Sequence, residues 1–136
     1  MNEAMKQKTN SSHKVLILNK RDAVASLIEL NQKLKKEDNS DKSLTLFRLG
    51  EILAFDLGNL NDSIDYFENI VNNFEESTVF PSATFALYSI YNIKNDSKKN
   101  VYRERILNTY PDSDFAKFII EDQNLNSVHK PSEMLL

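Results

Sequence analysis

Apolar residues between Ser43 and Tyr110 recur at spacings of three and four, which is the period of an amphipathic helix and not of a strand. Two such stripes come first, and Gly58-Asn59 between them supplies residues that commonly end a helix. Ser40 or Asp41 is expected to cap the first helix, and Asn59 or Asn61 the second. The stripes comprise Leu46, Leu49, Gly50, Leu53 and Leu57, then Ile64, Phe67, Ile70, Val71 and Phe74.

The same plan follows once more along the chain. A helix is expected to begin near Pro81 and to end at Asn95-Asp96, and its partner is expected to end before Pro111. The partner starts with the poorly apolar residues 98–100, so we expect its first turn to be loose. A short last helix is predicted after Asp112 or Ser113.

The sequence also matches itself at a shift of 36 residues, where YFENIVNNFEES (Tyr66–Ser77) lies over YRERILNTYPDS (Tyr102–Ser113). At the same shift Leu49-Gly50 lies over Phe85-Ala86. An amphipathic segment near residues 23–34 matches the second helix of a unit, because Ile28 lies 36 residues before Ile64. We interpret it as part of a degraded earlier unit, with residues 15–18 as remnants of its first helix.

Repeats of this length indicate helical solenoids, in which one helix pair cannot bury its apolar face alone. The predicted fold is therefore all-α: a short right-handed helical-repeat solenoid of antiparallel helix pairs, with about six helices. We expect residues 13–122 to form this domain, and residues 1–12 and 123–136 to be flexible segments. Because solenoids usually need about three repeats, we also expect self-association or docking onto a larger assembly.

Composition agrees with long helices. The 136 residues include two glycines and three prolines, fewer than a sheet protein of this size would use in its turns. The absence of cysteine excludes disulfides and thiolate chemistry. No apolar run reaches the length of a membrane span or of a signal-peptide core. As written, the sequence predicts a cytoplasmic protein, and a periplasmic or envelope-associated one if the N-terminus is incomplete.

Charge is unevenly distributed. Residues 1–37 carry eight Lys/Arg and four Asp/Glu, whereas residues 38–80 carry two and nine. The acidic middle argues against binding to a phosphate backbone there. The basic N-terminal third leaves open a regulatory subunit that contacts nucleic acid, although a solvated helix face explains the same residues. The candidate contacts are Lys14, Lys20, Arg21, Lys33, Lys35 and Lys36.

Few residues suggest chemistry. The two histidines, His13 and His129, lie in or beside the predicted tails, so they do not provide a rigid metal shell. Asp62, Asp65 and Glu68 share one side of a helix, which is typical of a solvated face. No glycine-rich phosphate loop or nucleophile elbow is present. We therefore expect a protein that is not an enzyme, without cofactor, metal or small-molecule substrate.

These units resemble the tetratricopeptide repeat family, which has a small residue after leucine in the first helix, a glycine-containing turn and a closing proline. The matching positions are Leu49-Gly50, Gly58-Asn59, Ile64, Phe67 and Pro111. The departures are Ser63 and Ile70 in place of alanines, and Glu75 in place of proline. The segment YPDSDFAK (Tyr110–Lys117) and its echo NFEES also look like repeats of bacterial envelope proteins associated with Tol–Pal or with outer-membrane assembly.

The resemblance implies a binding groove formed by the first helices. Its predicted residues are Leu44, Phe47, Glu51, Ala54 and Phe55, and their equivalents 36 residues later are Ala83, Leu87, Ile90 and Tyr91. Such a groove would take an apolar peptide or a partner helix, and the lack of lysine and asparagine argues against a carboxylate clamp. The alternative is that these side chains are ordinary core.

The resulting functional hypothesis is a protein–protein interaction module, an adaptor or scaffold that needs no cofactor. An envelope-assembly accessory factor whose export signal is missing is the first alternative. The nucleic-acid-contacting subunit is the second.

Overall fold

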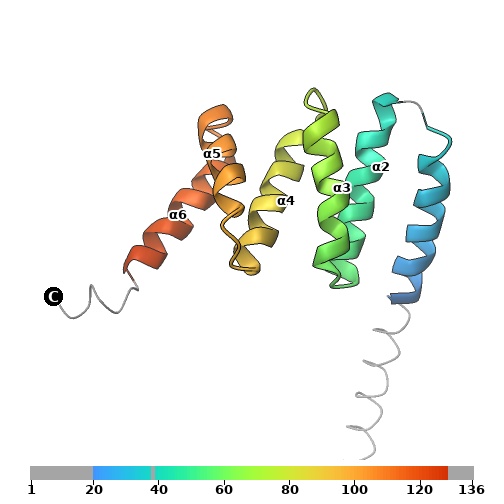
Figure 1. Cartoon of the computed structure of the whole chain (residues 1–136), viewed down its shortest axis with the longest axis horizontal. Coiled ribbons are helices and arrows are strands. Elements are labelled where there is room, and N and C mark those ends of the chain that lie inside the picture. The colour runs from blue at the N-terminus through green and yellow to red at the C-terminus, as the bar shows by residue number, and fades with distance from the viewer. Residues whose placement is uncertain (1–19, 38, 129–136) are drawn as a thin grey trace, which may run out of the picture. The chain divides into compact units, whose positions relative to one another are not determined.

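A computed structural model describes residues 20–37 and 39–128, and all regular structure in these ranges is helical (Figure 1). Helix 20–34 comes first. It is followed by α2 (Asn39–Glu51), which continues as the π-helix η1 (Ile52–Asp56), and then by α3 (Leu60–Asn73), α4 (Phe80–Ile93), α5 (Lys99–Thr109) and α6 (Asp114–Val128). The all-α prediction is confirmed for this part of the chain. The segment 15–18 and both histidines lie outside it.

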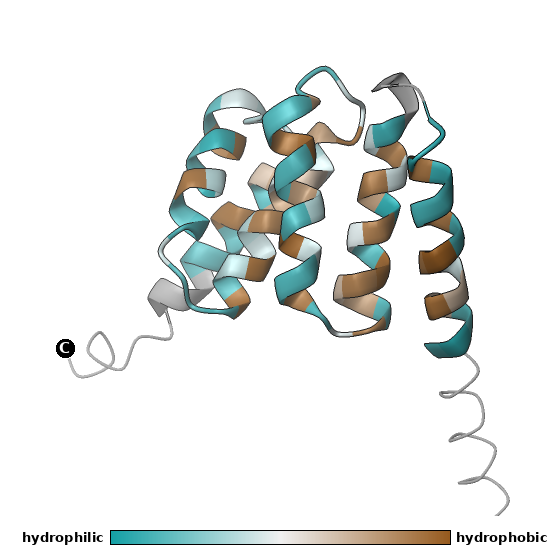
Figure 2. Ribbon diagram, turned by 45° about the vertical axis from the view of Figure 1, so that its right-hand side comes forward, coloured by the Kyte–Doolittle hydropathy of each residue, from teal (hydrophilic) through white to brown (hydrophobic). Residues whose placement is uncertain are grey.

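The chain divides into two compact units, Met1–Val79 and Phe80–Leu136. The first unit contains helix 20–34, α2, η1 and α3, and the second contains α4, α5 and α6. Hydrophobic and hydrophilic residues alternate around the helices (Figure 2). Among the described helices, none has the length and apolarity that crossing a membrane requires.

The core of the first unit centres on Phe67 of α3, whose side chain is fully buried. Its ring lies over Gly50 of α2, where a Cβ atom would approach Phe67 Cε1 and Cζ to 2.7 Å. The Phe47 ring meets the Phe67 ring edge-on, with centroids 5.6 Å apart. Gly50 therefore lets α2 and α3 pack with an aromatic ring between them, which explains the small residue in the sequence pattern.

Helix 20–34 joins this unit through polar contacts and the buried Ala23. The Thr45 hydroxyl donates to both carboxylate oxygens of Glu37, at 2.9 and 2.8 Å. Lys33 forms an ion pair with the same carboxylate at 3.2 Å. The Thr45 hydrogen bond attaches the chain just after the helix to α2, and the Lys33 ion pair orients the same carboxylate from within the segment.

The turn between α2 and α3 has an unexpected form. The Leu57 amide donates to the Ile52 carbonyl at 3.0 Å, an i→i−5 bond that makes the last turn wider than an α-helical one. Gly58 then adopts φ +66°, and the Asn59 side chain accepts from the Asp62 amide at 3.2 Å. The predicted stop and the Asn59 cap are confirmed. Ser40 and Asp41 do not precede α2 as predicted, because that helix begins at Asn39.

Both second helices end in the same way, which supports the repeat of 36 residues at this position. The Phe74 amide donates to the Ile70 carbonyl, and the Tyr110 amide to the Ile106 carbonyl, each at 2.8 Å. Both isoleucines are fully buried. The following serine hydroxyl accepts a backbone amide 3.2 Å away in each case, from Val79 to Ser77 and from Ala116 to Ser113. Ser113 thus caps α6, as predicted.

The second unit has a core of Tyr88, Ile106, Ala116 and Ile119, which brings together α4, α5 and α6. Phe85, Tyr102, Leu107 and Phe115 pack against it. The Phe85 ring stacks on Phe115 with centroids 4.8 Å apart and meets Phe118 edge-on at 5.6 Å. Aromatic side chains therefore hold α6 against α4.

Two helix boundaries differ from regular expectation. The turn before α5 contains three successive i→i−3 bonds, the last from the Val101 amide to the Lys98 carbonyl at 3.1 Å. This turn is wound tightly and is hydrogen-bonded at each step, which differs from the loose first turn predicted there. The last helix is not short: α6 continues past residue 122 to Val128, because no glycine or proline interrupts the sequence before Pro131.

We predict that Gly50→Ala lowers the stability of the protein, although alanine is the better helix former. The added Cβ would meet the Phe67 ring at 2.7 Å. Overpacking of this kind costs about 1–3 kcal/mol, more than the roughly 1 kcal/mol that alanine gains in helix propensity. Urea denaturation measures the difference. A double-mutant cycle with Phe67→Leu should show favourable coupling, and a stabilised Gly50→Ala protein would contradict the packing.

Candidate functional site

The first unit carries a strip of predicted groove residues along α2 and η1. Leu44 is 52% exposed and Phe55 is 67% exposed, while Phe47 and Glu51 between them are half-buried. Ala54 is buried and contributes little surface. Four of the five predicted residues of this unit therefore form an accessible, mainly apolar strip, which we call the α2 strip (Leu44, Phe47, Glu51 and Phe55).

Packing beneath the α2 strip restricts its side chains. Phe47 is held by its edge-on contact with the buried Phe67 ring. Glu51 lies 3.9 Å from Arg48, one turn earlier on the exposed surface. Phe55 belongs to η1, so the wide turn sets its direction relative to the rest of the strip. A restricted aromatic side chain is a good binding anchor because it loses little conformational freedom when a partner covers it.

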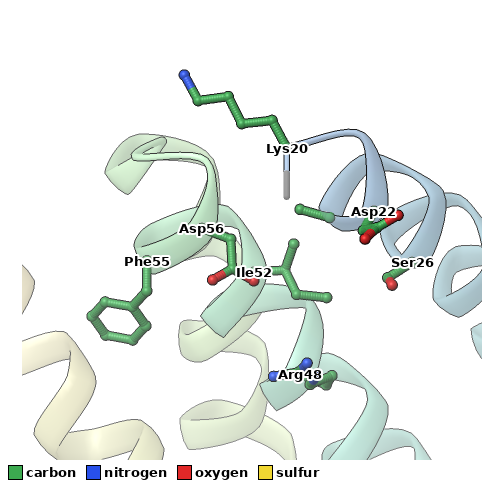
Figure 3. A pocket seen from close by; sticks show the side chains of 8 residues that line it. Lys20, Asp22, Ser26, Arg48, Ile52, Phe55 and Asp56 are labelled. Carbon is green, nitrogen blue, oxygen red and sulfur yellow. The ribbon is translucent and has the colours of Figure 1, made fainter. Parts of the chain in front are cut away.

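A hollow of about 420 Å³ lies beside the strip, between helix 20–34 and the end of α2 with η1 (Figure 3). Ile52 lies between Asp56 on one side and Asp22 on the other, and Lys20 extends outward. Two acidic and two basic side chains line the hollow with apolar groups. It is lined by Lys20, Asp22, Ala23, Ser26, Arg48, Ile52, Phe55 and Asp56. With both charges at its edge, this hollow selects no particular ion.

The four groove residues predicted in the second unit are buried. Ala83 and Leu87 are 0% exposed, Ile90 is 1% exposed and Tyr91 is 4% exposed. The Tyr91 ring stacks on Tyr102 of α5 with centroids 5.7 Å apart. Their burial favours the alternative recognised from the sequence, in which these positions are core.

These four residues were predicted wrongly because a shift of 36 residues does not align α4 with α2. At a shift of 36 residues, Phe55 (67% exposed) would match Tyr91 (4%), so the two positions are not equivalent. At a shift of 38, Leu49 matches Leu87 (both 0%), Ile52 matches Ile90 (both 1%), and Phe55 matches Ile93 (69%). The expected equivalence of Leu49-Gly50 with Phe85-Ala86 is therefore wrong.

The extra residues lie between the two helices of the first unit. The left-handed residues that end the first helices, Gly58 and Asn95, are 37 apart, so η1 accounts for one extra residue. The second extra residue lies between Gly58 and Tyr66. The equivalent stretch from Asn95 to Tyr102 is one residue shorter, because it contains the tighter i→i−3 turns before α5. The register then returns to 36 at Tyr66 and Tyr102.

In the corrected register, the second-unit equivalents of Phe47, Glu51 and Phe55 are Phe85, Ser89 and Ile93. Phe85 and Ser89 are half-buried and Ile93 is exposed, so each matches the exposure of its first-unit equivalent. Sequence reasoning missed these three residues. The recurring L-x-x-I of Leu49–Ile52 and Leu87–Ile90 is the signal that could have revealed them. We call Phe85, Ser89 and Ile93 the α4 strip.

A polar cluster lies near the second core and joins its three helices. It consists of Tyr88 from α4, Arg103 from α5 and Asp122 from α6. Burial raises the pKa of the Tyr88 hydroxyl above 10.0, and the charge of Asp122 and a hydrogen bond to it raise this pKa further, while Arg103 lowers it. The cluster links three helices, and its tyrosine is protonated at neutral pH.

The three acidic residues that share one side of α3 are all at least partly exposed. Asp62 and Asp65 are exposed and Glu68 is half-buried. No group of three or more potential metal-binding side chains occurs in residues 20–37 and 39–128. The sequence matches no protein-family model, no curated protein and no solved structure in the comparisons made.

We predict very different losses of stability for two aromatic residues that the sequence analysis assigned to one groove. Phe55→Ala should change the free energy of unfolding by less than about 0.5 kcal/mol, because the ring is mostly exposed. Tyr91→Ala should cost about 3–5 kcal/mol, because it removes a buried ring. Thermal and urea denaturation of both variants tests this. Equal losses would mean that Phe55 belongs to the core.

We also predict that stability falls as pH rises above 10.0, the ordinary pKa of tyrosine. In that range an unfolded tyrosine releases its proton while folded Tyr88 retains it, so the unfolded state is favoured. Tyr88→Phe should cost about 1 kcal/mol at neutral pH through the lost hydrogen bond. Its deficit relative to the original protein should shrink as pH rises. Urea titrations from neutral to alkaline pH test this, and a constant deficit would contradict it.

Proposed function

We propose that this chain is a short tetratricopeptide-like helical-repeat module that binds another protein through the α2 and α4 strips. Binding would be non-covalent and would require no cofactor. The observation that carries this proposal is the recurrence of the same exposure pattern on the first helices of both units, ending in Phe55 and Ile93 at 67% and 69% exposure.

Core packing does not account for these two exposed residues. A large apolar side chain that is two-thirds exposed contributes little to folding, yet its position recurs in the second unit. In both units the aromatic residue eight positions earlier, Phe47 or Phe85, is half-buried and in contact with another ring. Each strip therefore combines a fixed aromatic group with an exposed apolar end, which suits an amphipathic helix or an apolar peptide.

The chemistry of the strips limits the class of partner. Glu51 and Ser89 occupy equivalent positions, and neither supplies a positive charge for a terminal carboxylate. The expected ligand is thus an internal segment with apolar anchors spaced by helical turns, and not a free C-terminus. Since hot spots lie where apolar anchors exclude water, Phe55 and Ile93 are the positions to test.

The test compares proteins captured from the native cell by the original chain and by a Phe55→Asp/Ile93→Asp variant. We expect the variant to keep its melting temperature and to lose the specific partner, with an affinity at least about tenfold weaker. Val101→Asp is a matched control, because Val101 is 57% exposed and lies on α5, outside both strips.

Equal affinity of the variant and the original chain for a purified partner would contradict the proposal. Capture that disappears after nuclease treatment would instead support the nucleic-acid hypothesis. In that case the basic residues of helix 20–34 become the relevant surface.

A further inference from the structure

Each end of the described chain carries half of a helix pair. Helix 20–34 corresponds to a second helix, because Ile28 and Leu34 lie 36 residues before Ile64 and Ile70 of α3. The last helix, α6, corresponds to a first helix. Ser113, which caps α6, lies 36 residues after Ser77, which precedes α4. The intervening helices form complete pairs, α2 with α3 and α4 with α5.

In a complete pair, one face of the second helix packs against the first helix. In helix 20–34 much of the equivalent face is exposed. In α3 this face follows Leu60, Ile64 and Phe67 at helical spacing, and Phe67 contacts Phe47 and Gly50 of α2. The corresponding positions in helix 20–34 are Val24, Ile28 and Asn31, and the Asn31 side chain accepts a hydrogen bond from the Tyr66 hydroxyl of α3 at 3.5 Å.

Val24 and Ile28 are more exposed than their equivalents in α3. Val24 is 44% exposed and Ile28 is 56% exposed, whereas Leu60 and Ile64 are half-buried. An open hollow of about 460 Å³ lies over this face and is almost entirely apolar. It is lined by Lys20, Arg21, Val24, Ala25 and Ile28.

The last helix exposes the complementary face. Ala116 and Ile119 of α6 are buried in the second core, and beside them Ile120 is 45% exposed. Ile120 lies 36 residues after Thr84, which is 0% exposed, and Thr84 is the equivalent of Leu46 of α2, which is 4% exposed. Ile120 thus occupies a position that both complete first helices bury, and the exposed Glu121 lies next to it.

The charges of the two faces also match. Lys20, Arg21 and Lys35 are exposed near the two ends of the Val24–Ile28 face. On α6, Asp114 and Glu121 are exposed with one lysine, Lys117, between them. Opposite net charges favour encounter of these faces and disfavour pairing of either face with itself.

We propose that α6 of one copy packs against helix 20–34 of a second copy, which completes a helix pair between two chains. The contact is head-to-tail, so each copy retains one free end unless the assembly closes on itself. It leaves both strips of the proposed function uncovered and does not depend on that function.

The experiment measures the mass of the full chain by sedimentation from micromolar to millimolar concentration. We expect the mass to rise above that of a monomer as concentration increases. Val24→Asp/Ile28→Asp, which alters the helix 20–34 face, and Ile120→Asp, which alters the α6 face, should each weaken association at least about tenfold. All three residues are substantially exposed, and circular dichroism checks that both variants fold.

Mixing the two variants gives the decisive result. Each retains the face that the other lacks, so an equimolar mixture should form a one-to-one complex although neither associates alone. Glu121→Lys and Arg21→Glu provide a second pair of variants with the same expected behaviour. Val101→Asp is the matched control, and it should associate like the original chain because Val101 is 57% exposed and lies on α5, outside both faces.

Three outcomes would overturn the proposal. The original chain could remain monomeric at all concentrations. Ile120→Asp could associate normally, which would indicate that helix 20–34 pairs with itself. The mixture could also remain monomeric although the original chain associates.

Discussion

The fit of the Phe67 ring against Gly50 is the contact on which the first unit depends. An aromatic ring with no exposed surface lies where α2 has no side chain, and Phe47 closes the contact edge-on. This arrangement fixes how closely α2 approaches α3. It also fixes which residues of α2 remain outside the core, because each turn of a helix has only one buried side. The residues of the α2 strip lie outside that buried side.

The second unit reaches a similar result with different side chains. Tyr88 stands where the first unit has Gly50, so the space between helices is filled from α4 and not from α5. Tyrosine brings a hydroxyl into a buried place, and Asp122 of α6 supplies its hydrogen-bond partner. The second unit thus has a tyrosine-centred core where the first has a glycine–phenylalanine contact. The flanking positions keep their exposure, but the interior of the second unit is more polar.

A wide helical turn allows two units of different length to present the same surface. The i→i−5 bond at the end of α2 takes up one residue without breaking the helix, and Gly58 then reverses the chain. Phe55 consequently keeps the exposure that Ile93 has in the shorter unit. Both strips end in an exposed apolar side chain, and this pattern supports the proposed partner binding. The proposed assembly would use a separate surface.

The sequence by itself determined the helices, most of their ends and the equivalence of the two second helices. These features depend on local chemistry: apolar residues at helical spacing, asparagine and serine caps, and glycine or proline stops. It also indicated Leu44, Phe47, Glu51 and Phe55 correctly as neighbours along one helix. What it could not supply was the register of α4 relative to α2, since a single shift of 36 residues was assumed for whole units.

Only the tertiary structure decided that register. The exposure of Phe55 and the burial of Tyr91 depend on contacts with side chains distant in sequence, such as the stacking of Tyr91 on Tyr102. The π turn that shifts the register depends on how η1 packs, because its residues have no distinctive local signature. Periodicity shows that a helix has a buried side, but the neighbours that cover this side determine which residues belong to it.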